Sequence, residues 1–201
     1  MSNPAGPVVH VVDDDEALRD SLRWLLESAG HRVAAYATAE SFLAAFEPGQ
    51  AGCLVLDIRM PGMSGLELQD KLNRRGHTIP IIFVTGHGDV PMAVNAVKKG
   101  ALEFIEKPFN DQAFLVLIKK ALAFDAETRR AAARFVTLTQ REREVMKLIV
   151  AGKRNQDIAA KLSINIKTVE AHRANVMRKT DVGSLAELVQ LVHGAGAAGR
   201  R

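Results

Sequence analysis

Residues 53–65, C-L-V-L-D-I-R-M-P-G-M-S-G, decide the fold of this chain. The apolar run from Leu54 to Leu56 predicts a buried parallel strand, and Asp57 follows at its carboxyl end. In an open α/β sheet, ligands bind at that edge. Pro61 and Gly65 interrupt the backbone after Asp57, which suits a loop that bends sharply beside a charged group. A single Asp after a strand is also a common turn residue, so the interpretation depends on the rest of the chain.

On both sides of this stretch, strand-like and helix-like runs alternate. Apolar or β-branched runs at 8–12, 31–36, 54–57, 81–84 and 102–105 predict five strands. Apolar residues at helical spacing follow each of them. This alternation predicts an α/β domain over residues 1–124, with a parallel sheet covered by helices on both faces.

Polar side chains stand at the ends of four predicted strands. Asp13 and Asp14 follow the first strand, Asp57 the third, Thr85 the fourth and Lys107 the fifth. Since parallel strands end at one sheet edge, these side chains can line a single crevice. Three carboxylates repel one another unless a cation is present, and Mg²⁺ suits one or two carboxylates together with phosphate oxygens. We therefore expect Asp57 to accept a phosphoryl group, with Mg²⁺, Lys107 and Thr85 stabilising its oxygens.

Each of these residues also has a simpler explanation. The acids at 13–16 can stabilise the start of a helix through its dipole. Lys107, beside Pro108, can be a solvated turn residue. An EF-hand is a poor alternative, because its ligands alternate along a loop and these acids are consecutive. The order of all the residues along one sheet edge favours the phosphoryl site.

Composition and charge limit the class of protein. A chain of 201 residues, 47% of them apolar, suits one large soluble domain or two small ones. The single Cys53 allows no internal disulfide and no apolar run is long enough to cross a bilayer, so we expect a cytoplasmic protein without membrane contact. Residues 1–124 carry 12 basic and 15 acidic side chains (net −3), whereas residues 125–201 carry 15 and 8 (net +7). The basic second half is typical of a module that binds nucleic acid.

The second half is predicted to be all-helical. Residues 125–136 are rich in Ala and Arg and lack Pro and Gly, so they can form a linker or prolong the preceding helix. Thr139 and Glu142 form a capping box before an apolar helix. Two further helices, joined by the short turn 163–165, indicate a helix-turn-helix. A last helix completes a predicted four-helix domain over 137–201.

The second helix of this pair has two distinct faces. Val169, His172, Val176 and Thr180 lie on the face expected to pack inward. On the other face, three side chains can approach base edges: Glu170, which can accept from cytosine, and the small Ala171 and Ala174. Side chains expected to contact DNA phosphates are Lys153, Arg154, Lys167, Thr168, Arg173, Asn175, Arg178 and Lys179. The alternative is a basic face that is merely solvated.

Four motifs resemble the receiver domain of two-component response regulators. They are V-V-D-D-D-E at 11–16, L-D-I-R-M-P-G-M-S-G at 56–65, V-T-G-H-G-D-V-P-M-A-V at 84–94 and F-I-E-K-P-F at 104–109. The resemblance covers residues 8–122. It implies a flavodoxin-like five-stranded parallel sheet with strand order 2-1-3-4-5, and a sensor histidine kinase as phosphate donor.

The same resemblance implies a role for each residue at the sheet edge. Asp57 would be the phosphoacceptor, and Thr85 and Lys107 would bind the phosphoryl group. Mg²⁺ would be held by Asp13, Asp14, Asp57 and the backbone carbonyl of Arg59. Phe104 stands where receiver domains have an aromatic residue that turns inward on phosphorylation, and the neighbouring face would then form a dimer.

Three motifs in the second half resemble the LuxR-type DNA-binding domain. They are L-T-Q-R-E-R-E-V at 138–145, N-Q-D-I-A-A-K-L at 155–162 and K-T-V-E-A-H-R-A-N-V-M-R-K at 167–179. The resemblance implies that helix 166–179 enters the major groove. Thr180 replaces a usually apolar residue, which predicts weaker local packing. Lys153 replaces another, which predicts stronger contact with the DNA backbone.

The two resemblances together imply a transcription factor of the FixJ/NarL family of response regulators, and not an enzyme. It would dimerise on phosphorylation and bind double-stranded DNA, with RNA polymerase as a further expected partner. Two alternatives stay open. A phosphatase would turn over external substrates through the same aspartyl phosphate, although Arg59 stands where a general acid would be needed. A constitutive DNA-binding protein would use the receiver only for docking.

Overall fold

The chain folds into two compact units, which are described separately. The computed structural model describes residues 6–86 and 90–197. The first unit extends to Ala126, and the second extends from Glu127 to Ala197. Among the helices of these described residues, none combines the length and the apolar character needed to cross a bilayer.

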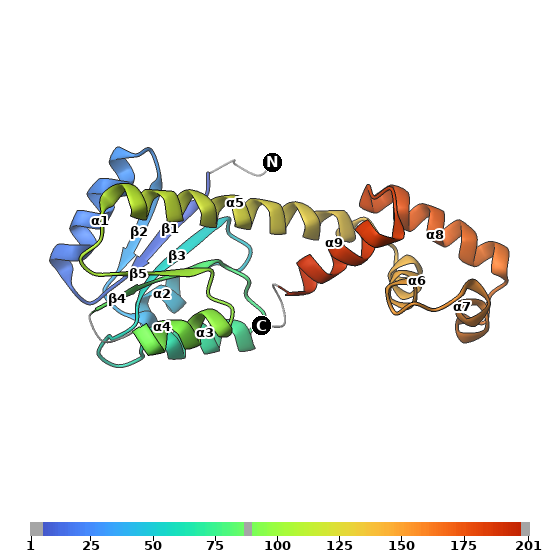
Figure 1. Ribbon diagram of the computed structural model, residues 1–201, viewed down its shortest axis with the longest axis horizontal. Helices are drawn as coiled ribbons and strands as arrows, with labels where there is room; N and C mark the ends of the chain where they lie inside the picture. Colours follow the sequence, from blue (N-terminus) through green and yellow to red (C-terminus); the bar gives the residue numbers. More distant parts are fainter. Residues whose placement is uncertain (1–5, 87–89, 198–201) are drawn as a thin grey trace. The chain divides into compact units, whose positions relative to one another are not determined.

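A five-stranded parallel sheet forms the centre of the first unit (Figure 1). Its order is β2-β1-β3-β4-β5, which confirms the predicted topology. The strands are β1 (Val8–Val12), β2 (Arg32–Tyr36), β3 (Gly52–Asp57), β4 (Ile81–Thr85) and β5 (Glu103–Glu106). The helices are α1 (Glu16–Ser28), α2 (Ala39–Ala45), α3 (Gly65–Arg74), α4 (Val90–Lys98) and α5 (Asp111–Val136). Every residue of β1, β3 and β4 is buried, as expected for strands covered on both faces.

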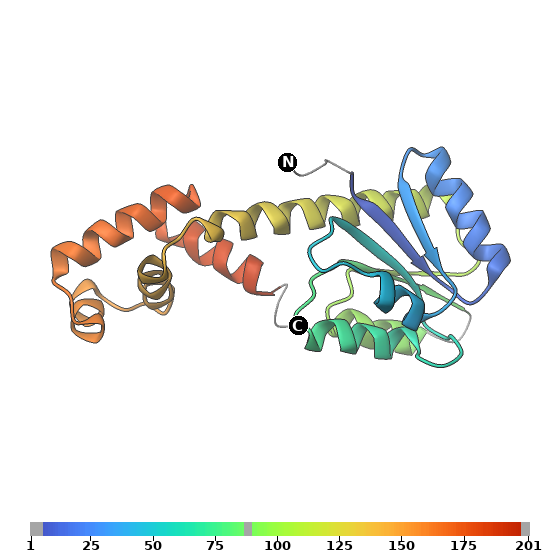
Figure 2. The same ribbon diagram turned by 180° about the vertical axis from the view of Figure 1, so that it is seen from behind.

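Alternation along the strands divides the apolar side chains between two cores. Side chains such as Val11 and Val55 pack with α1 and α5, whereas Leu54 and Phe83 pack with α2, α3 and α4. The helices lie accordingly on the two faces of the sheet (Figures 1 and 2). Successive strand residues point to opposite faces, so continuous apolar strands supply both cores at once.

Helix α5 continues through residues 125–136 as one helix. The segment lacks Pro and Gly, so nothing in its backbone chemistry ends the helix. Asp125, only 4% exposed, accepts a 2.9 Å hydrogen bond from the backbone N–H of Gly52 at the start of β3. This buried bond fixes the turn of α5 around Asp125 against the sheet.

The second unit is helical. After the end of α5 come α6 (Gln140–Val150), α7 (Asn155–Leu162), α8 (Ile166–Thr180) and α9 (Leu185–Ala197). Val145, Ile158, Val169, Val176 and Leu188 form its core, and each is 0% exposed. The capping box at Thr139 forms as predicted, with hydrogen bonds in both directions to Glu142.

Thr180 packs without an unpaired hydroxyl. It is fully buried, and its Oγ1 donates to the Val176 carbonyl at 2.7 Å, within its own helix. The weaker packing expected of a polar residue here is therefore offset by a local hydrogen bond. Asp181, the next residue, caps α8 in the left-handed conformation at φ 52°.

Candidate functional site

Strand register brings the predicted polar residues to one edge of the sheet. Val12 pairs with Leu56, so Asp13 and Asp57 follow in neighbouring positions. Asp57 pairs with Val84, and Thr85 pairs with Glu106, which puts Thr85 and Lys107 one step further along the same edge. The carboxyl ends of β1, β3, β4 and β5 thus deliver four functional groups to one place, as the alternation of strands and helices predicts.

Lys107 joins two of the carboxylates. Its Nζ lies 2.8 Å from Asp57 Oδ1 and 3.0 Å from Asp13 Oδ2. The side chains of Asp57 and Asp13 are only 9% and 3% exposed, while that of Lys107 is 30% exposed. The backbone N–H of Lys107 also donates to the Thr85 carbonyl at 2.7 Å. An ammonium group is therefore held directly at the candidate nucleophile.

The carboxylates of this cluster outnumber its cations. Burial raises the pKa of Asp57 above its ordinary value, and the charge of Asp13 raises it further, against the lowering effect of Lys107. Burial lowers the pKa of Lys107, but its hydrogen bonds to Asp57 and Asp13 outweigh this, so its pKa is raised overall. Two buried carboxylates share one ammonium, and a second cation would relieve the remaining negative charge.

Backbone groups hold both carboxylates in place. Asp57 Oδ2 accepts from the Arg59 N–H at 2.7 Å, and Asp13 Oδ1 accepts from the Asp15 N–H at 2.9 Å. Arg19, which sequence analysis did not single out, donates to the Asp13 carbonyl at 2.8 Å. Arg19 reaches this carbonyl because α1 begins directly after β1 and Asp13. No spacing of residue types in the sequence predicts the contact.

Two carboxylates at this sheet edge could hold Mg²⁺. Asp13 and Asp57 supply two oxygen donors, which is the number of carboxylates that Mg²⁺ usually takes. Asp14 is exposed, and Asp15 instead caps α1 by accepting from the Leu18 N–H at 3.2 Å. Across residues 6–86 and 90–197, no three His, Cys, Asp or Glu side chains gather as a set that could hold a metal ion. Asp13 and Asp57 therefore suit the two carboxylates that would hold a magnesium ion, and a contribution from Asp14 stays a prediction.

Thr85 carries an unused hydroxyl. The residue is 0% exposed, and within the described part of the chain its Oγ1 has no hydrogen-bond partner. Buried polar atoms normally have a partner, so this one is available to an incoming ligand. Phe104 of β5 pairs with Phe83 of β4 and is half-buried against the core beneath α3 and α4.

Gly65 allows the loop after Asp57 to close tightly. A Cβ at this position would lie 2.1 Å from the Asp57 carbonyl oxygen, a distance that no side chain can occupy. The Gly65 N–H donates to the Ile58 carbonyl at 3.0 Å, and Ser64 caps α3 in a capping box with Glu67. The sequence indicates a sharp bend here, and the close approach of the Asp57 backbone carbonyl is what requires the glycine.

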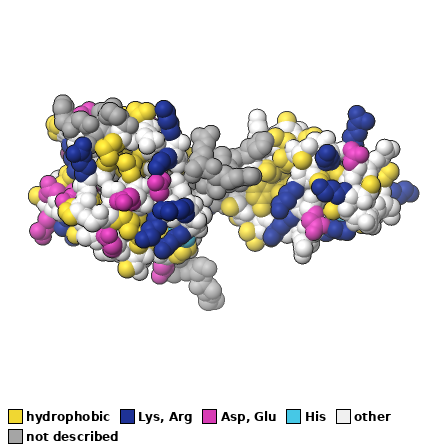
Figure 3. Space-filling model, turned by 90° about the horizontal axis from the view of Figure 1, so that it is seen from below, with side chains coloured by type: hydrophobic (Ala, Val, Ile, Leu, Met, Phe, Trp, Pro, Cys, Tyr) yellow, Lys and Arg dark blue, Asp and Glu magenta, His cyan; other side chains and the backbone are white. Residues whose placement is uncertain are grey.

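The candidate DNA-binding helix, α8, has the two faces that its sequence predicts. Val169 and Val176 are fully buried, and His172 is half-buried. Among the residues expected at the DNA, those exposed are Lys153, Arg154, Lys167, Glu170, Ala171, Ala174 and Arg178, and those half-buried are Thr168, Arg173 and Asn175. Asn165 Oδ1 caps the helix by accepting from the Thr168 N–H at 2.7 Å. Lys and Arg side chains are spread over the visible surface of the helical unit (Figure 3).

Lys179 differs from the other predicted phosphate contacts. Its Nζ lies 2.7 Å from Glu142 Oε2, and the two side chains are 23% and 4% exposed. The hydrogen bond from Lys179, with those from Thr139, lowers the pKa of Glu142 to about 2. The ammonium has a buried partner, so at the DNA Lys179 would share its charge with Glu142, and its phosphate contact stays a prediction. Glu142 was expected only as a helix cap, and nothing in the spacing of 37 residues signals the ion pair.

Comparison with known proteins accounts for both units. Residues 9–119 match the response regulator receiver domain. Residues 136–192 match the luxR family of bacterial regulatory proteins. The chain belongs to the two-component response regulators that join a receiver domain to a LuxR-type DNA-binding domain.

Several relatives share this arrangement over nearly the whole chain. The transcriptional regulatory protein FixJ of Azorhizobium caulinodans is 47% identical over 97% of this chain and 96% of its own length. FixJ of Rhizobium meliloti is 46% identical over 94% of this chain and 96% of its own. The crystal structure of full-length FixJ from B. japonicum, 42% identical, covers 95% of this chain and 98% of its own with a TM-score of 0.55. The low-resolution structure of the response regulator StyR, 48% identical, covers 94% and 99% with a TM-score of 0.61.

These likenesses define the coarse function. The chain is a two-component response regulator, whose receiver implies a sensor kinase and whose LuxR-type domain implies DNA binding. Receiver domains generally bind Mg²⁺ at their acidic phosphorylation site. The related proteins are transcriptional regulators.

Proposed function

We propose that a sensor histidine kinase phosphorylates Asp57, and that this switches dimerisation and sequence-specific DNA binding to regulate transcription. One observation carries the proposal: the Lys107 ammonium lies within hydrogen-bond distance of both Asp57 and Asp13. A carboxylate at a sheet edge with a fixed cation beside it can act as a nucleophile toward phosphorus.

In the proposed reaction, an Asp57 oxygen forms a bond to phosphorus as the phosphorus–nitrogen bond of the donor phosphohistidine breaks. The released imidazole nitrogen takes up a proton. Lys107 offsets charge on the transferring oxygens, and the Thr85 hydroxyl, which has no partner among the described residues, donates to one of them. Asp13, Asp57 and the Arg59 carbonyl would hold Mg²⁺, with Asp14 beside them. When bound, Mg²⁺ neutralises charge on the phosphoryl oxygens.

The new charge is also the signal. A phosphoryl group adds negative charge and three acceptor oxygens, so it can draw Thr85 and Lys107 toward itself. Thr85 pairs with Glu106, and Phe104 lies two residues earlier on β5, so the half-buried ring is near the strand end that carries Thr85. We propose that Phe104 then turns inward and that the surface around β5 becomes a dimer contact.

The DNA-binding half of the proposal rests on α8. Glu170, Ala171 and Ala174 form an exposed strip that can meet base edges in the major groove. The side chains that would contact phosphates are Lys153, Arg154, Lys167, Thr168, Arg173, Asn175, Arg178 and Lys179, the last of which also pairs with Glu142. A phosphorylated dimer would present two such helices to a two-fold site, in the cytoplasm, where RNA polymerase can be its further partner.

A gel-shift series tests the whole proposal. Duplexes selected from a random library are titrated with the full chain, at fixed salt, with and without acetyl phosphate and Mg²⁺. Tighter binding with the phosphodonor, lost in Asp57→Asn, is expected. Equal affinity in both conditions would favour a constitutive DNA-binding protein. In a separate assay, steady multiple turnover of an external phosphoester would favour a phosphatase.

A further inference from the structure

Arg141, in the first turn of α6, donates to two groups at once. Its Nη1 lies 2.7 Å from Glu144 Oε2, one turn further along the same helix, and its Nη2 donates to the Leu162 carbonyl at 2.8 Å. Leu162 is the last residue of α7, so the second bond joins the start of α6 to the end of α7. Arg141 is not among the residues that the sequence predicts at the DNA.

The Leu162 carbonyl takes its donor from outside its own helix. The last carbonyls of an α-helix have no donor within the helix, and a cation at that end also meets the negative end of the helix dipole. Two earlier carbonyls of α7 are satisfied by the turn that follows: Ser163 N–H donates to Ala160 at 3.3 Å, and Ile164 N–H donates to Ala159 at 3.1 Å. The guanidinium of α6 supplies the donor for Leu162, and a hydrogen bond from a charged group is stronger than one between neutral groups.

The bond to Leu162 restrains the turn that leads into α8. Ser163 takes the left-handed conformation at φ 54°, Asn165 caps α8, and only residues 163–165 separate the two helices (Figure 1). So short a connection leaves the start of α8 little freedom once the end of α7 is fixed. In a helix-turn-helix, the first residues of the second helix contact base edges, and Glu170 and Ala171 lie in the first half of α8.

Two consecutive residues of α6 restrain opposite ends of α8. Glu142 pairs with Lys179, in the last turn of α8, at 2.7 Å. Arg141 holds the turn that precedes the first residue of α8. The core packing of Val169 and Val176 is non-directional, whereas hydrogen bonds depend on distance and angle. The two polar contacts therefore add the directional restraint that apolar packing does not supply.

We propose that Arg141 is a positioning residue for DNA recognition, which fixes the start of α8 and thereby raises sequence selectivity without itself contacting a base. Base contacts need hydrogen-bond geometry, which a small change in helix direction destroys, whereas phosphate contacts through long flexible side chains tolerate such a change. Loss of the Arg141 guanidinium should therefore weaken binding to the preferred sequence more than binding to an unrelated one. This inference rests on the proposed sequence-specific DNA binding.

Two simpler roles for Arg141 give different expected results. A guanidinium that contacts a DNA phosphate would contribute equally to all sequences, and its removal would reduce the slope of log affinity against log salt by about 0.9. A guanidinium that only stabilises the fold would change the melting temperature and leave the affinity of the folded protein as it is. Positioning predicts a lower ratio of specific to non-specific affinity with an unchanged slope.

The experiment measures the affinity of the full chain, with acetyl phosphate and Mg²⁺, for a duplex selected from a random library and for a scrambled duplex. Fluorescence anisotropy is recorded over a series of salt concentrations, well below the melting temperature of each variant. The variants are Arg141→Gln and Arg141→Lys, which keeps the charge but lacks the planar fork that serves two partners at once. Arg143→Gln is the matched control, because it removes the same charge from α6, is exposed, and reaches only the Val136 carbonyl, at 3.3 Å.

Arg141→Gln should bind the selected duplex about 3- to 10-fold more weakly; Arg141 is 42% exposed, so water weakens its charged hydrogen bond. Its affinity for the scrambled duplex and its salt slope should stay unchanged, Arg141→Lys should lose less selectivity, and Arg143→Gln should match the unaltered chain.

An equal loss on both duplexes, a slope reduced by about 0.9, or unchanged selectivity in Arg141→Gln would overturn the inference and leave the DNA-binding assignment intact. If Arg141→Gln does not fold, the same criteria apply to Arg141→Lys. If the unaltered chain binds both duplexes equally, the proposed sequence-specific binding fails, and this inference with it.

Discussion

Replacing Glu142 by Gln should weaken the helical unit by a measurable amount that depends on pH. The carboxylate accepts from Lys179 Nζ at 2.7 Å and from the Thr139 N–H at 2.8 Å. The shift of its pKa from 4.5 to about 2 would be worth roughly 3 kcal/mol at most, from the relation between pKa and free energy. Lys179 is 23% exposed, so water screens the pair, and a loss of about 1–2 kcal/mol is the better expectation. Gln can still form the capping box, so the loss measures the charge.

The pH dependence follows from the sign of that shift. A carboxylate whose pKa is lowered by folding stabilises the folded state above its unfolded pKa, and the stabilisation is lost as pH falls toward the folded value. The unaltered unit should therefore lose stability between pH 4.5 and about 2, and Glu142→Gln should lack that part of the loss.

Urea unfolding followed by circular dichroism at pH 7 and pH 3 measures both effects. Hydrogen exchange of α8 peptides assigns the change to the helical unit. The control is Glu144→Gln, because Glu144 pairs with Arg141 at a similar 2.7 Å but is 37% exposed. It should cost at most about 0.5 kcal/mol. Equal stability of Glu142→Gln and the unaltered chain at pH 7, or equal losses in both Gln variants, would refute the reasoning.

Three further substitutions test other parts of the structure. Asp57→Asn should raise the melting temperature at pH 7, because burial raises the pKa of Asp57 and so disfavours its charged form in the folded state. The gain should begin to fade as pH falls through the raised pKa of the folded state and should be gone below the unfolded pKa; a fixed gain at all pH values would argue against this cause. Gly65→Ala should lower the free energy of unfolding by about 2–3 kcal/mol and slow phosphorylation by acetyl phosphate, because its Cβ would lie 2.1 Å from the Asp57 carbonyl oxygen. Gly183→Ala is the control: the atom nearest to its Cβ would be 3.7 Å away, so little should change. Asp181→Gly should raise the free energy of unfolding by about 1 kcal/mol in the same assay, because Asp181 caps α8 at φ 52°, a conformation that costs glycine less than other residues. A lower free energy of unfolding would mean that the Asp side chain stabilises the cap.

Much of the fold could be predicted because its signals are local and repeated. Continuous apolar strands alternating with amphipathic helices specify a parallel sheet. Once the sheet is given, its geometry alone brings Asp13, Asp57 and Lys107 to one edge. The Thr139 capping box could likewise be predicted, because it needs only residues three positions apart.

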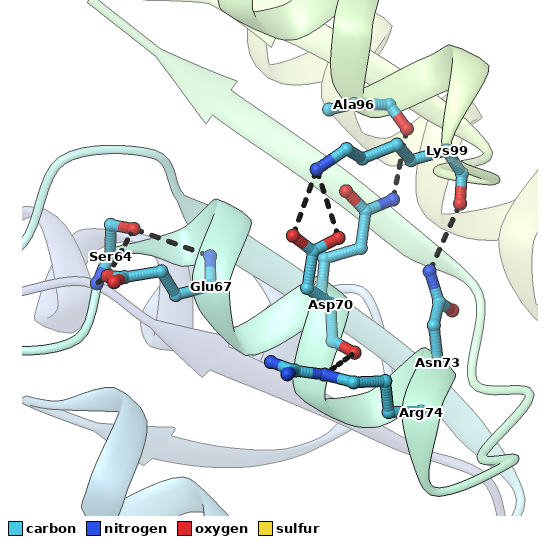
Figure 4. A network of polar contacts seen from close by, with 8 residues as sticks. Ser64, Glu67, Asp70, Asn73, Arg74, Ala96 and Lys99 are labelled. Atoms are coloured by element: carbon cyan, nitrogen blue, oxygen red, sulfur yellow. Dashed lines mark hydrogen bonds and ion pairs between the residues drawn. The ribbon is translucent and has the colours of Figure 1, made fainter.

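The contacts that sequence could not supply join distant segments. In the sequence, Lys179 does not differ from the other basic residues of α8. Its ion pair with Glu142 forms only because α6 packs beside α8. Gln69 donates to the Ala96 carbonyl and Asn73 donates to the Lys99 carbonyl (Figure 4). Every residue has a backbone carbonyl, so no pattern of residue types predicts these hydrogen bonds. Composition allows residues 125–136 to be either a helix or a linker. Asp125, at the start of this segment, is held by a hydrogen bond from Gly52, which is 73 residues away along the chain, and no local pattern predicts that bond.

The most direct test of the central claim is to find where a phosphoryl group is attached. The full chain is treated with acetyl phosphate and Mg²⁺, the acyl phosphate is reduced with borohydride, and the reduced side chain is located by peptide mass spectrometry. Reduction at Asp57 is expected, and much less of it in Lys107→Ala, which removes the ammonium 2.8 Å from Asp57 Oδ1. Labelling at Asp13 or Asp14 in place of Asp57, or none under conditions that phosphorylate a known receiver domain, would contradict it.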